Sequence, residues 1–210
     1  NKPVHMALLC LHGFVPIALV GGQGDYGTAI VFGFIFAAMI ISAKISWKYL
    51  AAAPVLLAAA LVFLWNFVLK SDHKNRIEVL LHPGTDPEGL EYQQDLGLAA
   101  LNKGGFLGIG LFGDKNEYIS VPEIHNDFIL SYAGMVFGFV GAVGLLAILA
   151  YICLKILADS RIAKDNLGKF ICMGTFGLML AHCIMNIGMV LKVMPVIGIP
   201  LPFLSAGGTA

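Results

Sequence analysis

Residues 128–157 read FILSYAGMVFGFVGAVGLLAILAYICLKIL, an apolar run in which Lys155 is the one charged side chain. A helix needs roughly 17 to 25 apolar residues to cross the hydrocarbon core of a bilayer, so this run predicts a membrane-spanning helix. Immediately before it, the stretch VPEIHNDFIL (residues 121–130) places Glu123, His125 and Asp127 at the last polar positions before Phe128. The sequence therefore predicts titratable side chains at the edge of a membrane, within reach of a lipid-borne substrate.

The rest of the chain has the composition of a membrane protein. Hydrophobic residues make up 58% of the sequence and charged residues 12%, and the mean hydropathy is +0.83. Further apolar runs predict spans over residues 4–20, 28–42, 47–69 and 168–193. Prolines and paired glycines interrupt residues 194–210, which therefore predict broken or re-entrant backbone covered by protein. We predict an all-α, multispanning transmembrane protein, with residues 1–210 forming a single membrane domain that is part of a longer protein.

The charges orient these predicted spans. Lys44 and Lys48 lie in one connection, and Lys155, Arg161, Lys164 and Lys169 lie in or beside another. Because Lys and Arg are enriched in cytoplasmic loops, the alternate connections face outward. The longest of these, residues 70–127, carries ten of the thirteen acidic residues and is expected to be extracytoplasmic. No basic stripe with interleaved aromatic residues is present, so a nucleic-acid partner is not expected.

Two interpretations of the polar edge remain open. Asn126 or Asp127 could cap the helix that starts near Phe128, because a short polar side chain accepts hydrogen bonds from first-turn amides. Alternatively, the helix end would hold Asp127 ionised as a base that accepts a proton from a sugar hydroxyl. His125 could be an interfacial hydrogen-bonded imidazole, and Glu123 a surface acid of the first turn.

Three other segments carry structural signals. Residues 90–101 predict a short helix that ends at Lys103-Gly104-Gly105, where glycine suits the residue after a helix end. The run GGFLGIGLFG (residues 104–113) has the glycines of a phosphate-binding loop but lacks the flanking strand and Lys-Ser/Thr, so a turn packed on membrane helices is favoured. His182 and Asn186 are one helical turn apart, which favours hydrogen bonding between helices.

Several segments together resemble the SEDS family (shape, elongation, division and sporulation), which includes RodA, FtsW and SpoVE. The matching elements are Gln23, Asp25, Gly27 and Thr28; Arg76 with HPGTDP; Tyr92-Gln93; Gly104-Gly105 and Gly108-x-Gly110; Pro122, Glu123, His125, Asp127 and Phe128 of P-E-x-H-x-D-F; Asn186 to Met189; and residues 195–208 of P-x-x-G-x-P-L-P-F-x-S-x-G-G. Members of the family have about ten spans, so this chain resembles the C-terminal half.

The resemblance implies a peptidoglycan glycosyltransferase in the bacterial cytoplasmic (inner) membrane, multi-pass, that polymerises lipid II at the outer face beside a class B penicillin-binding protein. Asp127 would be the essential carboxylate and general base, and the donor glycan would leave its undecaprenyl pyrophosphate carrier. Arg76, Lys103, Lys115 or a divalent cation such as Mg²⁺ or Mn²⁺ would offset pyrophosphate charge.

The substrate-binding set that the motifs imply also contains Glu123, His125, Gln93, Asn186, Ser205, Gly207 and Gly208. Two other classes of function remain open. A lipid II flippase or transporter is indicated by the broken segment, since discontinuous helices often build transport sites. A noncatalytic membrane scaffold for a penicillin-binding protein is the third reading.

Overall fold

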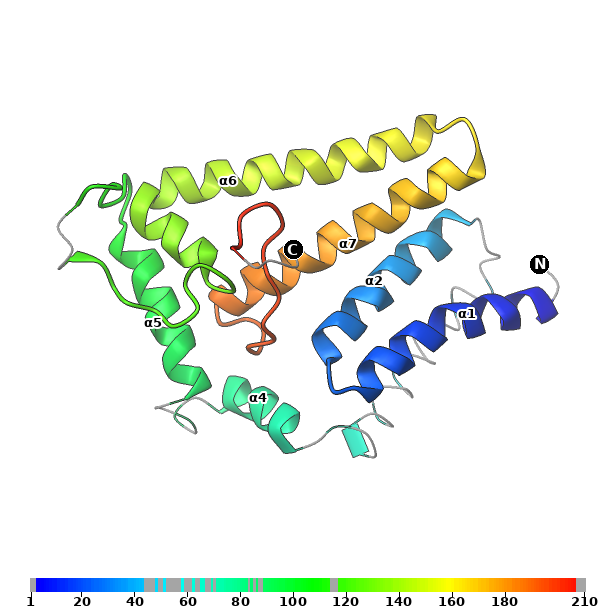
Figure 1. The fold of residues 1–210 in the computed structure, drawn as a ribbon, viewed down its shortest axis with the longest axis horizontal. Helices are drawn as coiled ribbons and strands as arrows, with labels where there is room; N and C mark the ends of the chain where they lie inside the picture. Colours follow the sequence, from blue (N-terminus) through cyan, green and yellow to red (C-terminus); the bar gives the residue numbers. More distant parts are fainter. Residues whose placement is uncertain are drawn as a thin grey trace. The chain divides into compact units, whose positions relative to one another are not determined.

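The computed structural model describes residues 3–43, 48, 51, 58, 62, 65–66, 69, 71–82, 84, 86, 89–113 and 117–206. All regular structure among these residues is helical, and the predicted class, an all-α multispanning membrane protein, is confirmed. Figure 1 shows the helices in chain order. Most of the span predicted over residues 47–69, together with Lys115, Gly207 and Gly208, lies outside the described residues.

The chain divides into two compact units. Unit 1 consists of Asn1–Ile77 and Leu157–Leu178, and unit 2 consists of Glu78–Ile156 and Met179–Ala210. The two longest helices, α6 (Ile129–Ile162) and α7 (Asn166–Val190), each contribute to both units. Both are long and apolar enough to cross a membrane.

Unit 1 contains α1 (Pro3–Gly22) and α2 (Tyr26–Ser42), which are shorter apolar helices joined by a tight turn. Asp25 is the N-cap of α2, and its carboxylate accepts a hydrogen bond of 3.0 Å from the amide of Thr28. At Gly177 the backbone of α7 approaches α2 so closely that an added Cβ would lie 2.8 Å from the carbonyl oxygen of Phe34. Glycine therefore permits these two helices to pack.

The predicted extracytoplasmic loop contains two helices among its described residues. It contains α4 (Ser71–Leu81) and α5 (Leu90–Lys103), of which only α5 was predicted from the sequence. Glu91 is buried in the first turn of α5, and both of its carboxylate oxygens accept hydrogen bonds of 2.8 Å from the amide of Gly84, which precedes the helix. Asp86 accepts a further bond, of 2.8 Å, from the amide of Leu90 at the start of the helix.

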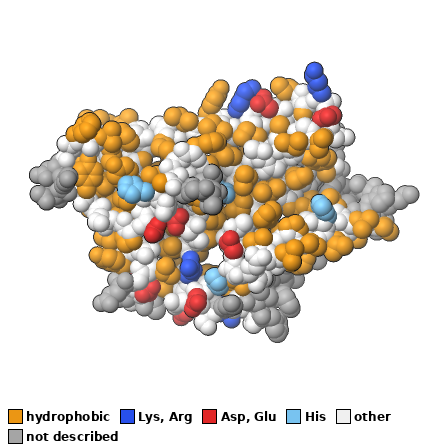
Figure 2. Space-filling model, viewed as in Figure 1, with side chains coloured by type: hydrophobic (Ala, Val, Ile, Leu, Met, Phe, Trp, Pro, Cys, Tyr) orange, Lys and Arg blue, Asp and Glu red, His pale blue; other side chains and the backbone are white. Residues whose placement is uncertain are grey.

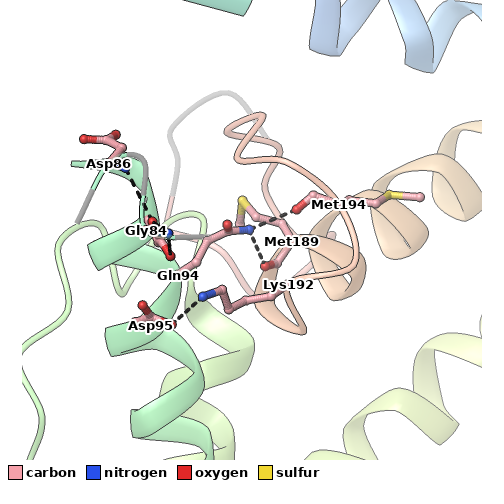
Figure 3. A network of polar contacts seen from close by, with 8 residues as sticks. Gly84, Asp86, Gln94, Asp95, Met189, Lys192 and Met194 are labelled. Carbon is pink, nitrogen blue, oxygen red and sulfur yellow. Dashed lines mark hydrogen bonds and ion pairs between the residues drawn. The ribbon is translucent and has the colours of Figure 1, made fainter. Parts of the chain in front are cut away.

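Within unit 2, α5 is fastened to the end of α7 (Figure 3). The buried Gln94 donates two hydrogen bonds of 2.9 Å from Nε2, one to the carbonyl of Met189 and one to that of Met194. Asp95, the next residue, forms an ion pair of 2.5 Å with Lys192. The carbonyl of Met189, at the end of α7, also accepts a hydrogen bond of 3.1 Å from the amide of Lys192, so Gln94 adds a second bond at this helix end.

A glycine-rich loop, residues 104–110, covers a break in α6. At Gly138 the backbone leaves the helical conformation, with φ of 68° and ψ of −169°. The carbonyls of Met135 and Val136 accept hydrogen bonds from the amides of Ile109 and Gly110, and the amides of Phe139 and Val140 donate to the carbonyls of Gly105 and Phe106. All four backbone groups at the break are therefore paired with the loop, as a break in an apolar helix requires.

The same contact explains the glycines of the loop. An added Cβ would lie 2.0 Å from the carbonyl oxygen of Gly134 at Gly104, and 2.1 Å from that of Val136 at Gly108. Backbone therefore packs directly on backbone, which only glycine allows. The favoured interpretation of this segment, a turn packed on membrane helices, is confirmed.

After α7 the chain is not helical. Residues 191–206 form turns and irregular backbone, with positive φ at Lys192, Gly198 and Phe203. The prediction that prolines and glycines break this segment is confirmed over its described part.

Candidate functional site

The segment that carries Asp127 is a series of turns between Pro122 and Phe128. The carbonyl of Glu123 accepts hydrogen bonds from the amides of Asn126 (3.0 Å) and Phe128 (3.3 Å). Glu123 itself has a φ of 54°, a left-handed conformation that is uncommon outside glycine, and its carboxylate accepts a bond of 2.6 Å from Nδ2 of Asn126. The turn is therefore closed by local contacts before α6 starts at Ile129.

Three consecutive carbonyls of this turn are bound by residues that lie far away in the sequence. The carbonyl of His125 accepts a hydrogen bond of 2.8 Å from the amide of Ala206. That of Asn126 accepts one of 2.6 Å from Oγ of Ser205, and that of Asp127 accepts one of 2.7 Å from Nδ2 of Asn186. We call this set of three bonds the carbonyl clamp. It fixes the backbone at Asp127 and does not involve the side chains of the turn, of which those of Asn126 and Glu123 bond each other.

Ser205 and Asn186 also bind the broken segment itself. Oγ of Ser205 accepts a hydrogen bond of 2.8 Å from the amide of Leu201, and Nδ2 of the fully buried Asn186 donates a second bond, of 2.8 Å, to the carbonyl of Ile199. One turn earlier on α7, Nδ1 of His182 bonds the carbonyl of Pro200 at 2.9 Å. Since a carbonyl only accepts, Nδ1 of His182 carries the proton here. The expected hydrogen bonding by His182 and Asn186 is made to this segment.

The carboxylate of Asp127 faces backbone at Gly198. A Cβ placed on Gly198 would lie 3.3 Å from Oδ2 of Asp127, and Gly198 has a φ of 74°. The side chain is half-buried, and among the described residues nothing donates a hydrogen bond to its carboxylate. The carboxylate of Asp127 is therefore half-buried and lies next to the main chain of Gly198.

The electrostatic setting of Asp127 differs from the one expected from the sequence. Burial raises the pKa of the Asp127 carboxyl above its usual range, and the nearby negative charge of Glu123 raises that pKa further. The sequence analysis expected the helix end to favour the charged form of Asp127, whereas the two causes that act on its pKa in the structure, desolvation and the charge of Glu123, both disfavour that form.

The capping interpretation is also wrong. Asn126 bonds Glu123 with its side chain, and the amide of Phe128 is satisfied by the carbonyl of Glu123. Two residues separate Asn126 from the start of α6 at Ile129. Neither Asn126 nor Asp127 therefore caps α6 with its side chain.

His125 is exposed beside the same turn. Its ring meets that of Tyr132 edge to face, with centroids 5.4 Å apart and planes 65° apart. Neither ring nitrogen forms a hydrogen bond with another described residue, so the imidazole can still bind a ligand.

The remaining predicted site residues lie in different places. Gln93 is half-exposed on α5, and the contacts to α7 are made by its neighbour Gln94, which the sequence analysis did not single out. Lys103 is exposed at the end of α5. Arg76 belongs to unit 1, whereas Asp127 belongs to unit 2. The structure thus brings together Glu123, His125, Asp127, Asn186 and Ser205, and adds Asn126 and Gly198.

Carboxylate oxygens are the side-chain ligands that a divalent cation would need near Asp127. No three His, Cys, Asp or Glu side chains among them come together as ligands, and at the turn the acidic pair is Glu123 and Asp127 alone.

Known proteins are similar to this chain in sequence and in fold. A family model described as "Cell cycle protein", which covers FtsW, RodA and SpoVE, matches residues 1–210. The peptidoglycan glycosyltransferase MrdB of Escherichia coli (strain K12) is 33% identical over 198 residues, which is 94% of this chain and 54% of that protein. A probable peptidoglycan glycosyltransferase FtsW of Geobacter metallireducens is 31% identical over 195 residues, which is 92% of this chain and 51% of that protein.

A solved structure has a similar fold. It comes from work on the structural coordination of polymerization and crosslinking by a peptidoglycan synthase complex. The TM-score is 0.77 at 25% sequence identity, over 100% of this chain and 59% of that one. The chain therefore spans about half the length of the curated relatives that it matches.

Proposed function

The chain belongs to the FtsW, RodA and SpoVE family of cell cycle proteins, and on this premise we propose that it is the C-terminal half of a peptidoglycan glycosyltransferase. The proposed substrates are lipid II as acceptor and an undecaprenyl-linked glycan as donor. The relatives named as peptidoglycan glycosyltransferases support the reaction class.

The observation that carries the proposal is the setting of Asp127. The carbonyl clamp fixes its backbone through Ala206, Ser205 and Asn186, while its carboxylate stays unbonded among the described residues and half-buried. A general base works best when its pKa lies closer to the operating pH than that of an ordinary aspartate. Burial and Glu123 both move the pKa of Asp127 in that direction.

In the proposed reaction, Asp127 accepts the proton of the 4-hydroxyl of the acceptor sugar. The hydroxyl oxygen then bonds to the anomeric carbon of the donor, and the bond from that carbon to the pyrophosphate breaks. The donor carrier leaves as undecaprenyl pyrophosphate with the bonding electron pair, and the proton remains on Asp127 until water removes it. Cations of the chain, Lys103 among them, would offset the charge that develops on the pyrophosphate.

The proposed topology puts this chemistry on the outer face of the bacterial cytoplasmic membrane. It follows from the Lys and Arg residues at Lys48, Arg161 and Lys164, which mark the opposite side. A class B penicillin-binding protein is the proposed partner, and the similarity to a chain from a peptidoglycan synthase complex supports it.

Lipid II polymerisation by the purified full-length protein, with and without the partner, tests the proposal. Asp127→Asn should lower the polymerisation rate by about 100-fold or more, the contribution typical of a general base. Glu123→Gln removes the neighbouring carboxylate but leaves the base in place, so it should lower the rate less than Asp127→Asn does. Asp127→Asn protein that is folded and polymerises at the parent rate would overturn the role of Asp127.

A transporter remains the second candidate, because a non-helical segment lies beside a carboxylate at Gly198. The same two variants separate the two functions when reconstituted in vesicles. Lipid II translocation that is lost in Asp127→Asn, with no polymerisation by either protein, would favour the transporter. A scaffold would show neither activity.

A further inference from the structure

An open hollow of about 560 Å³ lies where α6 turns into α7 in unit 1. It lies at the opposite end of α6 from Asp127, and the proposed reaction makes no use of it. Its lining includes Ser160, Arg161, Lys164, Asp165 and Lys169. The hollow is within the size range of sites that bind small ligands, about 300–1,000 Å³.

The charge of the lining is positive, with three cations against one carboxylate. That carboxylate is engaged, since Oδ1 of Asp165 accepts a hydrogen bond of 2.7 Å from the amide of Gly168 in the first turn of α7. Arg161 and Lys164 are exposed and form no ion pair with any described side chain. Their charge is therefore available to an anion, and a guanidinium matches phosphate oxygens in a bidentate arrangement.

Lys169 is held in position by another helix of unit 1. Its Nζ donates a hydrogen bond of 2.9 Å to the carbonyl of Ser42, the last residue of α2. The ammonium group thus remains at the hollow and keeps two donors for a ligand.

Apolar side chains stand next to these charges. Ile162 and Leu167 flank the turn and are 77% and 67% exposed. Figure 2 shows charged side chains gathered near the turn between α6 and α7 and apolar side chains over much of the same face. Both helices are apolar enough to span a membrane, so their shared turn lies at the membrane–water boundary.

We propose that this hollow binds the phosphodiester headgroup of an anionic phospholipid, with the phosphate between Arg161, Lys164 and Lys169 and the acyl chains against Ile162 and Leu167. Basic pockets between membrane helices on the cytoplasmic side are suited to such headgroups. The inference rests on α6 and α7 crossing the membrane and is independent of the proposed glycosyl transfer.

Native mass spectrometry of the full-length protein in detergent, titrated with phosphatidylglycerol and with phosphatidylcholine, tests the site. Each positive charge near a lipid surface contributes about fivefold in affinity, so the double variant Arg161→Gln/Lys164→Gln should bind phosphatidylglycerol roughly 25-fold more weakly. Lys48→Gln is the control, because it removes an exposed cation from the same proposed side but does not line the hollow. It should change binding less than about twofold.

A second arm separates a lipid from a soluble phosphate. Ile162→Ser/Leu167→Ser should weaken phosphatidylglycerol binding, and glycerol 3-phosphate should compete poorly. Efficient competition by glycerol 3-phosphate, unaffected by the serine variant, would mean a soluble phosphate ligand and would overturn the lipid assignment. Equal binding of both lipids, or no difference between the double variant and Lys48→Gln, would overturn the site itself. All variants alter exposed side chains, and their melting temperatures check that they fold.

Discussion

The carbonyl of Asp127 accepts a hydrogen bond from Asn186, whereas the carboxylate of the same residue lies against the backbone of Gly198. Position and chemistry thus depend on different atoms of one residue. The clamp restricts where the carboxylate can go, which is the positional restraint that a base needs near its substrate. Burial and Glu123 set its affinity for a proton.

The raised pKa of Asp127 predicts a pH dependence. Activity requires the ionised carboxylate, so the rate should fall as the pH drops through the raised pKa. In Glu123→Gln the like charge is gone, so the pKa of Asp127 falls and the acid limb of the pH–rate profile should move to lower pH. The profile of lipid II polymerisation for the parent and this variant measures the shift. If the acid limb of the Glu123→Gln profile does not move, the group that titrates in that limb is not Asp127.

The raised pKa of Asp127 also predicts how the stability of the fold depends on pH. A carboxyl whose pKa is raised on folding stabilises the fold most below its unfolded pKa, and this contribution is lost as the pH rises through the folded pKa. At neutral pH the ionised Asp127 therefore costs stability. Asp127→Asn should melt at or above the parent temperature while losing activity, so a lower melting temperature would instead indicate a structural role.

At this scale the sequence predicts residues better than it predicts their pairing. The motifs single out Asp127, Asn186 and Ser205, but the clamp joins positions 59 and 79 apart in the chain. Local patterns carry no signal for such distances. Gly198 acquires its importance only from what the fold brings near it, and the same is true of Gln94 beside the predicted Gln93.

Among the elements, α6 depends on a partner from outside itself. Its break at Gly138 leaves four backbone groups that the glycine-rich loop pairs. Unpaired groups in hydrocarbon would cost several kcal/mol each (about 2–7). The stability of α6 at this break therefore depends on the hydrogen bonds that the loop supplies.

Alanine at Gly108 and at Gly110 separates backbone strain from lack of space. Both glycines have a positive φ, of 83° and 81°, so alanine should cost each about 1–2 kcal/mol. At Gly108 the new Cβ would also meet the carbonyl oxygen of Val136, whereas at Gly110 nothing lies within 4 Å among the described residues. Gly108→Ala should therefore lower the melting temperature of the full-length protein clearly more than Gly110→Ala does. Equal effects would mean that the loop does not pack on α6 as described.

The length of the apolar runs predicted α6 and α7 to within a few residues, and the stop at Lys103-Gly104-Gly105 helped to predict α5, but α4 was missed. The sequence of α4, SDHKNRIEVLL, is polar, and a helix of 11 residues is marginal on its own. Its order comes from packing, since Val79 is buried and the ring of His73 meets that of Tyr26 with centroids 4.4 Å apart. The break at Gly138 was not predicted either, because GFVGAVG reads as ordinary apolar helix.

For the whole molecule, the distribution of charge predicts which side of the membrane each end of α6 faces. A cysteine at Phe112, which is fully exposed in the predicted outer loop, should react with a membrane-impermeant maleimide in intact cells. A cysteine at Asn166, the exposed first residue of α7, should react only after the membrane is opened. The background lacks the four native cysteines, all of which are free among the described residues. The opposite labelling pattern would overturn both the orientation and an enzyme that acts outside.

The glycine-rich loop is made before the helix that it completes. Ribosomes add residues in order, so residues 104–110 emerge ahead of Gly138, and in the proposed topology they are already across the membrane when α6 enters it. When α6 enters the membrane, the backbone groups of the loop that pair with its break have therefore already been synthesised. A change of order, such as a circular permutation that moves the loop behind α6, would leave the break at Gly138 without partners during biogenesis, although the finished protein would contain every contact.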